Sequence, residues 1–218
     1  QRCKNLVKAV AAQQAVQDTM VFLQGLGVSP SLAARIYKRY GDEAQAVLRR
    51  NPYVLADEVH GVGFRTADRL ARELGIGANS IERARAAALF QLERAVDEGH
   101  MYLPFAELLT TVERDLGVAS EQAKAAVEGL AANGRLVMEG SVPDQPVYLS
   151  RLHWAEREVA RMLIRLAQAP RTGQLTLEAD GQDQLASMSL TPEQLVAVDQ
   201  ALRGGVVVIT GGPGTGKT

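Results

Sequence analysis

Several features that would mark a specialised protein are absent from this sequence. It has a single cysteine, Cys3, which can form neither an internal disulfide bond nor a zinc site. Its three histidines are scattered without metal-ligand spacing, so we assign them no ligand role. No run of about 18 or more apolar residues could span a membrane, and no secretory signal opens the chain. These absences favour a soluble protein of the reducing cytoplasm, with no membrane partner.

Neither sign of charge dominates the chain. Its formal net charge is −1, from 24 Lys and Arg against 25 Asp and Glu. Residues 1–100 nevertheless hold 14 of the basic residues and 11 of the acidic ones. A basic surface in this part could contact nucleic-acid phosphates, although a solvated helix face explains the excess almost as well. The cations in question are Arg35, Lys38, Arg39, Arg49, Arg50, Arg65, Arg69 and Arg72.

The sequence does contain a phosphate-binding motif. Residues 211–218 fit the P-loop pattern G-x-x-x-x-G-K-[ST], and the run 206–210 before them is typical of a buried parallel strand. Lys217 is expected to reach the outer phosphates and the Thr218 hydroxyl to hold Mg²⁺, which makes these two the candidate catalytic residues and Thr218 the metal ligand. The motif predicts that ATP or GTP binds at Gly211, Gly212, Pro213, Gly214, Thr215, Gly216, Lys217 and Thr218.

A further candidate nucleotide contact precedes the P-loop. Gln194 follows Thr191 by three residues, which is the capping-box pattern of a helix N-terminus. The Gln194 amide could instead pair with the donor and acceptor on the edge of an adenine base. The local pattern favours the cap, the P-loop downstream favours the adenine contact, and the two roles can coexist.

A Gly-hydrophobe-Gly turn between helices occurs twice, at Gly25-Leu26-Gly27 and at Gly61-Val62-Gly63. Both turns resemble the hairpin of a helix-hairpin-helix module. The backbone N–H groups of such a hairpin, with the N-terminus of the next helix, can hold a DNA phosphate without reading sequence. The second copy is the stronger DNA-binding candidate because Arg65 and Arg69 follow it. The alternative is that both turns serve packing or protein contacts.

Periodicity, caps and turn residues predict the remaining elements. Within residues 99–150, two helices followed by two short strands give a winged-helix order. Its candidate recognition helix, Glu121–Ala132, carries one lysine and two glutamates, which favours a spacer or docking role over insertion into a DNA groove. Helices are expected at 6–24, 30–40, 42–50, 53–59, 64–74, 82–98, 104–116, 120–133, 151–168 and 192–202, extended segments at 101–103, 136–139, 146–149 and 206–210, and a loop at 169–184.

These elements predict a mostly α-helical chain. A tandem helix-hairpin-helix region is expected at 1–98 and a winged-helix-like segment at 99–150. A helix and connector at 151–189 then lead to the first strand and P-loop of a RecA-like α/β motor domain at 190–218. Trp154 is expected to pack at the start of its helix rather than to stack on a base.

This order of motifs resembles the RecD-like DNA helicases of superfamily 1, in the longer bacterial form with an N-terminal extension. The resemblance covers essentially the whole chain and is sharpest at 51–53, 60–68, 190–194 and 211–218. It implies ATP hydrolysis with Mg²⁺, coupled to 5′–3′ movement along single-stranded DNA in repair or recombination. It also implies that Gln194 contacts adenine, Lys217 the phosphates and Thr218 the magnesium ion.

We expect the chain to be the N-terminal part of such a helicase and to lack ATPase activity by itself. The acidic motif, arginine finger and second motor domain that phosphoryl transfer requires do not occur in these 218 residues. The rival interpretation is a DNA- or protein-binding adaptor module attached to a P-loop ATPase that is not a helicase. Sequence beyond the P-loop would separate the two, because a helicase carries a second RecA-like domain with DNA-facing motifs.

Overall fold

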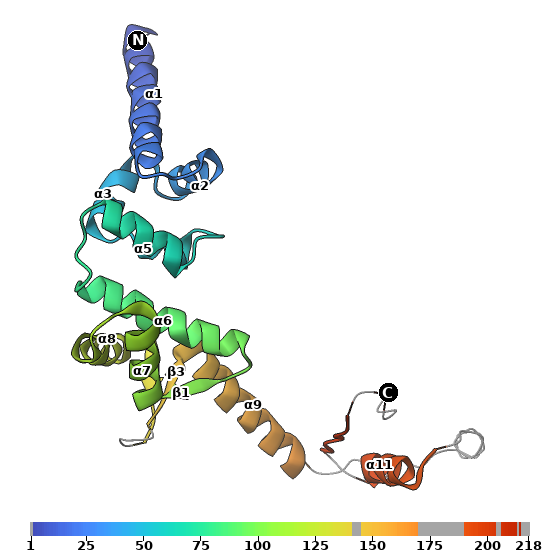
Figure 1. The fold of residues 1–218 in the computed structure, drawn as a ribbon. Helices are drawn as coiled ribbons and strands as arrows, with labels where there is room; N and C mark the ends of the chain where they lie inside the picture. Colours follow the sequence, from blue (N-terminus) through green and yellow to red (C-terminus); the bar gives the residue numbers. More distant parts are fainter. Residues whose placement is uncertain (1, 141–144, 170–189, 204–205, 213, 215–218) are drawn as a thin grey trace. The chain divides into compact units, whose positions relative to one another are not determined.

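The computed structural model describes residues 2–140, 145–169, 190–203, 206–212 and 214, and most of these residues are helical (Figure 1). The predicted mostly α-helical class is therefore confirmed. The chain divides into two units, Gln1–His153 and Trp154–Thr218. In chain order the elements are α1 (Arg2–Gly25), α2 (Pro30–Tyr40), the 3-10 turn η1 (Gly41–Glu43), α3 (Ala44–Arg50), α4 (Val54–Glu58), α5 (Phe64–Glu73), α6 (Ile81–Asp97), β1 (Tyr102–Pro104), α7 (Phe105–Leu116), α8 (Ser120–Ala132), β2 (Leu136–Met138), β3 (Pro146–Leu149), α9 (Ser150–Gln168) and α11 (Pro192–Arg203).

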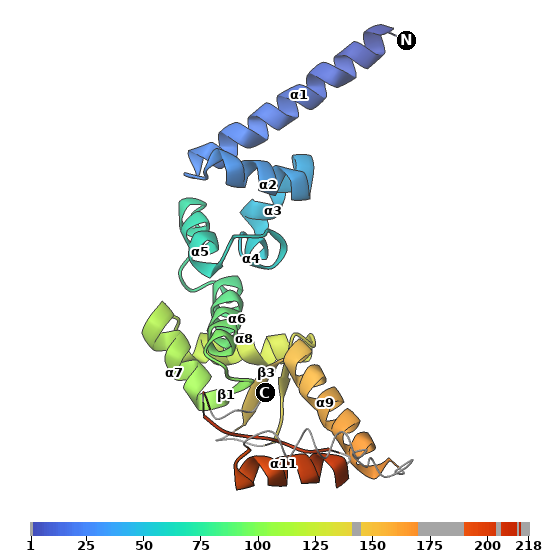
Figure 2. The same ribbon diagram turned by 90° about the vertical axis from the view of Figure 1, so that its right-hand side faces the viewer.

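Helices α1 and α2 form the first helix-hairpin-helix copy, with the boundaries that local signals dictate. The Ser29 hydroxyl caps α2 by accepting the N–H of Leu32 at 3.4 Å, and Pro30 stands in the first turn, where no N–H is needed. Gly41 ends this helix with a φ of +56°. Helices α4 and α5 and the hairpin between them form the second copy (Figure 2).

The first unit has two hydrophobic cores, and α5 contributes to both. The first core gathers apolar side chains from α1 to α5. Helix α5 adds Leu70 to this core, whereas its Phe64, Ala67 and Ala71 belong to the second core. The second copy is thus packed against the segment that follows it as well as against the first copy. The fully buried large side chains of the first core are Leu23, Ile36, Leu48, Leu55 and Leu70.

The second core is formed by α6, α7, α8 and a small antiparallel sheet of strand order β1-β3-β2. Both strands of the predicted wing are present. The extended segment expected at 101–103 adds a third strand, with Leu103 opposite Val147. Met138 of β2 also faces Val147, which is fully buried, so one face of the sheet closes the core. The predicted domain boundaries after residues 98, 150 and 189 remain predictions.

Two expectations for the second unit are wrong. Trp154 does not pack at the start of its helix, since 69% of its surface is exposed. Residues 206–210 do not form a strand, and Val208 is 81% exposed. A strand requires a neighbour to complete its hydrogen-bond ladder, and the described residues of this unit include no other strand. The β-branched run therefore has the composition of a strand without the partner that would make it one.

Apolar side chains of α9 are also exposed, among them Val159, Met162 and Leu163. The loop expected at 169–184 lies outside the described residues, apart from its first position. Within the part of the chain that the structure describes, no helix is both long enough and apolar enough to cross a membrane.

Candidate nucleic-acid interface

At the first hairpin, the backbone N–H groups are used to close α1. The N–H groups of Leu26, Gly27 and Val28 all donate to carbonyls in the last turns of that helix, at 2.9–3.2 Å. Gly27 has a φ of +69°, a conformation that glycine adopts without strain. The predicted DNA-contacting glycines Gly25 and Gly27 therefore flank a turn whose donors already have acceptors, and their contact with DNA stays a prediction.

At the second hairpin, two glycine N–H groups are open. Gly61 has a φ of +79°, and Gly63 is the extended N-cap residue of α5, with a φ of −103°. Val62 between them is buried and donates to the carbonyl of Val59 at 3.1 Å. Among the described residues, no acceptor receives the N–H of Gly61 or of Gly63. This hairpin thus keeps donors available at the start of a ten-residue helix.

Two arginines on α5 add positive charge beside this hairpin. Arg65 and Arg69 are one turn apart and exposed, and no carboxylate of the described residues forms an ion pair with either. Arg72, the third candidate on the helix, differs because it is paired with Asp68 at 2.5 Å. The structure therefore brings together Gly61, Val62, Gly63, Arg65 and Arg69, the predicted DNA-contacting residues of the second copy.

The first copy reaches the second hairpin through side chains of α2. Arg39 forms an ion pair with Glu58 at the end of α4, at 2.5 Å. One turn earlier on α2, the Arg35 guanidinium donates from Nη1 to the backbone carbonyl of His60. Both contacts end on the segment that leads into Gly61, so α2 supports the second hairpin from outside its own copy.

A buried polar network, which sequence analysis did not identify, fixes α5 against α6. Asp68 is 4% exposed and accepts hydrogen bonds from the Tyr53 hydroxyl and from Arg83 Nε, both at 2.8 Å. Arg83, itself 7% exposed, also donates to the carbonyl of Leu116 at 2.8 Å. The sequence does indicate this network, because Asp68 lies on the same face of α5 as the apolar side chains of Ala67 and Ala71. A carboxylate that is buried on such a face requires a hydrogen-bonding or charged partner.

The network controls the ionisation of its members. Burial acts to raise the pKa of Asp68, but hydrogen bonds from Arg83, Tyr53 and Arg72 outweigh it and hold that pKa below its ordinary value of 3.8. Burial, with the hydrogen bond to Asp68, raises the pKa of the Tyr53 phenol well above its ordinary value. Asp68 is therefore a charged structural group at neutral pH. Its oxygens are occupied by these donors, which excludes it as a proton donor or acceptor for a ligand.

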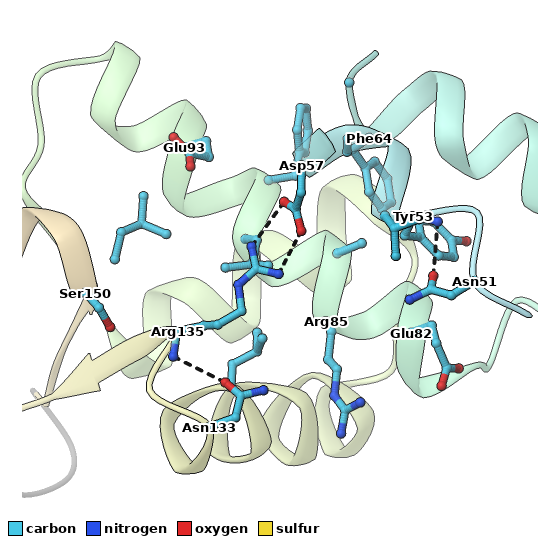
Figure 3. A pocket seen from close by; sticks show the side chains of 18 of the residues that line it. Asn51, Tyr53, Asp57, Phe64, Glu82, Arg85, Glu93, Asn133, Arg135 and Ser150 are labelled. Atoms are coloured by element: carbon cyan, nitrogen blue, oxygen red, sulfur yellow. Dashed lines mark hydrogen bonds and ion pairs between the residues drawn. The ribbon is translucent and has the colours of Figure 1, made fainter. Parts of the chain in front are cut away.

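A cavity of about 550 Å³ lies where the second copy meets α6, α8 and the ends of β2 and β3 (Figure 3). Its apolar wall includes Phe64 and Phe90, whose rings stack at 5.2 Å. Asp57 and Arg135 face one another across it and form two hydrogen bonds, of 2.7 and 3.1 Å. No local pattern predicts this cavity, because its lining residues come from segments that are distant along the chain.

The charges around the cavity balance. Its lining includes three arginines and three carboxylates, and two of the arginines are paired with two of the carboxylates. A polyanion gains little from such a surface. The exposed arginines of the second hairpin, not this cavity, are the better match to DNA. The charged lining residues are Arg85, Arg135, Arg151, Asp57, Glu82 and Glu93.

In the second unit, the predicted capping box is formed. The Gln194 side-chain carbonyl accepts the N–H of Thr191 at 2.8 Å, and the Thr191 hydroxyl accepts the N–H of Gln194 at 3.3 Å. A backbone N–H and the Thr191 hydroxyl lower the pKa of neighbouring Glu193, as suits an acid in a first helical turn. Gln194 thus has a structural role, and its adenine contact remains a prediction.

Only part of the P-loop motif can be described. Gly214 has a φ of +77°, a conformation that glycine adopts without strain. Gly211 and Gly212 are exposed. The other predicted nucleotide contacts, Pro213, Thr215, Gly216, Lys217 and Thr218, lie outside the described residues. In the described ranges, no group of three or more histidine, cysteine or acidic side chains is placed to hold a metal ion.

Comparison with known proteins agrees with this geometry. Residues 12–102, which include both hairpins, match the family described as the ATP-dependent RecD2 DNA helicase HHH domain. The chain is also 30% identical over 223 residues to the ATP-dependent RecD2 DNA helicase of Deinococcus radiodurans. That match covers 98% of this chain and 31% of the relative, so the chain spans about a third of the length of this relative. Both findings show that the chain is similar to the RecD-like DNA helicases, and they support its interpretation as an N-terminal fragment of such a protein.

Proposed function

We propose that this chain is the N-terminal part of an ATP-dependent DNA helicase that moves 5′ to 3′ along single-stranded DNA. The observation that carries the proposal is the similarity to a RecD2 helicase, which extends over 98% of the chain, together with the family match at residues 12–102, which includes both hairpins. Because the chain spans 31% of that relative, the activity is assigned to a longer protein. The 218 residues alone are proposed to be inactive.

In this proposal the nucleotide is ATP with Mg²⁺. The backbone of residues 211–216 would surround the phosphates, Lys217 would contact the outer ones, and Thr218 would hold the metal ion. Gln194 would contact the adenine base through its side-chain amide, which can both donate and accept a hydrogen bond. Bound Mg²⁺ supplies neutralisation of the charge that develops on the phosphates.

The tandem helix-hairpin-helix region is proposed to contact single-stranded DNA through the second hairpin. Two features of the described residues support this choice over the first hairpin: the open N–H groups of Gly61 and Gly63 at the start of α5, and the charges of Arg65 and Arg69, which form no ion pair there. None of these contacts reads a base, so the binding is expected to be independent of sequence.

Nucleotide chemistry is tested in the longer protein with Lys217→Ala. The variant is expected to lose ATP hydrolysis and unwinding, whereas Lys124→Ala, which removes an exposed lysine from α8, should retain both. Comparing duplexes with a 5′ or a 3′ single-stranded tail tests the direction of movement. The purified 218-residue chain should show no ATP turnover, and turnover that disappears on Lys217→Ala would overturn its assignment as inactive.

DNA contact is tested with the 218-residue chain and a labelled oligonucleotide whose fluorescence anisotropy reports binding. Replacing Arg65 and Arg69 by glutamine should reduce the slope of log affinity against log salt by about 1.4, at about 0.7 per phosphate contact on a single strand. The matched control replaces Lys124 and Arg157, which are exposed and lie outside the hairpins. An unmodified chain that fails to bind at low salt would instead favour a protein-docking role for the hairpins.

A further inference from the structure

Arg35 belongs to the first copy, but its guanidinium lies on the second hairpin. Its Nη1 donates to the carbonyl of His60, the residue before Gly61. A Cβ atom added to Gly61 would lie 2.7 Å from Arg35 Nη1, 3.7 Å from its Cζ and 3.8 Å from its Nη2. The guanidinium therefore occupies the space that a side chain at position 61 would fill.

Gly61 is thus required for two separate reasons. Its φ of +79° is a conformation that residues with a side chain rarely adopt, and its missing Cβ leaves room for the guanidinium. Gly27 has a comparable φ of +69° in the first hairpin, but no atom lies within 4 Å of its hypothetical Cβ. The close approach of a cation is a feature of the second hairpin and is not repeated in the first.

The charge of Arg35 is not neutralised by its contact. A backbone carbonyl carries no net charge, and in the described ranges no carboxylate lies within ion-pair distance of this side chain. Its neighbour Arg39, one turn along α2, is paired with Glu58. Hydrogen-bonding capacity also remains, because Arg35 is exposed and only its Nη1 has an assigned acceptor.

We propose that Arg35 is a phosphate-contacting residue of the second hairpin, so that both copies build one DNA-binding site. The second copy would supply the N–H groups of Gly61 and Gly63, and the first copy would supply the guanidinium. The carbonyl of His60 holds Nη1 and orients the remaining donors, which suits a planar group that can bind phosphate through two atoms. This inference rests on the proposed contact of the second hairpin with single-stranded DNA.

The test compares Arg35→Gln with Lys124→Gln in the 218-residue chain, using the same anisotropy measurement. Both substitutions remove one exposed positive charge, but Lys124 lies on α8, outside the hairpins, whereas Arg35 touches the second hairpin. Arg35→Gln should weaken binding about tenfold at low salt and reduce the salt slope by about 0.7, the value for one phosphate of a single strand. Lys124→Gln should leave the slope unchanged. Arg35→Lys keeps the charge and should restore the slope without restoring the full affinity.

A second measurement needs no substitution. Phenylglyoxal modifies exposed arginines, and mass spectrometry of the digested chain reports the rate at each position. DNA should slow the modification of Arg35 several-fold and leave that of Arg157, an exposed arginine of α9, unchanged. Equal rates at Arg35 with and without bound DNA, or an unchanged salt slope in Arg35→Gln, would overturn the inference. If the unmodified chain binds no DNA at all, the proposed contact of the second hairpin with DNA fails, and the inference about Arg35 fails with it.

Discussion

The two hairpins share a Gly-hydrophobe-Gly sequence, and each has one glycine at positive φ, yet their hydrogen bonding differs. In the first hairpin, the N–H groups of residues 26–28 donate to carbonyls at the C-terminal end of α1, where a helix lacks donors of its own. In the second, α4 has only five residues and the chain leaves it before the glycines, so Gly61 and Gly63 keep open donors. The difference teaches that the pattern specifies the turn, whereas the preceding helix decides which donors remain.

The copies also differ in how their second helices are held. Helix α2 places Leu32, Ala33 and Ile36 in one core and uses ion pairs or hydrogen bonds only at its exposed side. Helix α5 contributes to two cores and adds the buried carboxylate of Asp68, which is held by Arg83. The position of the second hairpin therefore depends on contacts with the segment that follows it. Removing the ion pair between Asp68 and Arg83 should destabilise the second copy most.

The largest effect is expected for Asp68→Ala. Removing one partner of a buried ion pair leaves Arg83 charged, buried and short of acceptors, which costs about 3–5 kcal/mol of unfolding free energy. Asp42→Ala is the control in the first copy, because Asp42 is exposed and accepts one hydrogen bond from Tyr37, at 3.0 Å. The control should cost about 1 kcal/mol or less. Urea unfolding measures both, and comparable losses would remove the contrast between the two copies.

Lowering the pH should weaken the same ion pair between Asp68 and Arg83. The pKa of Asp68 is lower in the folded chain than its ordinary value of 3.8, so the unfolded chain binds more protons in that range and stability rises with pH. The contribution is complete above about pH 4 and is lost as pH falls through the folded-state pKa. Unfolding free energies measured from pH 6 to pH 2 should decline less in Asp68→Asn than in the unmodified chain. If the two curves of unfolding free energy against pH are parallel, protonation of Asp68 does not contribute to the pH dependence of stability.

The next largest difference in unfolding free energy between the two copies is expected when Gly27 or Gly61 is replaced by alanine. Alanine at either positive-φ position costs about 1–2 kcal/mol of backbone strain. Gly61→Ala should cost about 1 kcal/mol more than Gly27→Ala, because its Cβ displaces Arg35 from the carbonyl of His60 and breaks that hydrogen bond. In an Arg35→Ala background the excess should vanish, which a double-mutant cycle measures.

Gly63→Ala provides the control for these glycine substitutions. Gly63 has a φ of −103°, and its added Cβ meets no atom within 4 Å. Because Gly63 is the N-cap residue of α5 and alanine is a poorer N-cap than glycine, this substitution should lower the unfolding free energy by about 1 kcal/mol or less. If Gly61→Ala and Gly27→Ala are equally destabilising, Arg35 contributes nothing to the second hairpin.

Local signals in the sequence were sufficient for elements and turns, but not for contacts between distant segments. Ser29 with Pro30 predicts the start of α2, and glycine at position 41 predicts its end, because a cap is satisfied within a few residues. The pairing of Asp68 with Arg83 and of Arg35 with His60 depends on how helices pack, which no local pattern encodes. The run 206–210 fails for the related reason that a strand is defined by its neighbour.

The smallest effect is expected for the exposed link between the second copy and the winged-helix-like segment. Asp57 and Arg135 are joined by two hydrogen bonds, but 46% and 47% of their side-chain surfaces are exposed. Water competes for such a pair, so the coupling energy between Asp57→Asn and Arg135→Gln should be about 1 kcal/mol or less. A double-mutant cycle measures it. A coupling energy close to the unfolding free energy lost in Asp68→Ala would mean that the cavity excludes water from this pair. Two ion pairs, Asp68–Arg83 and Asp57–Arg135, would then hold the second hairpin in place.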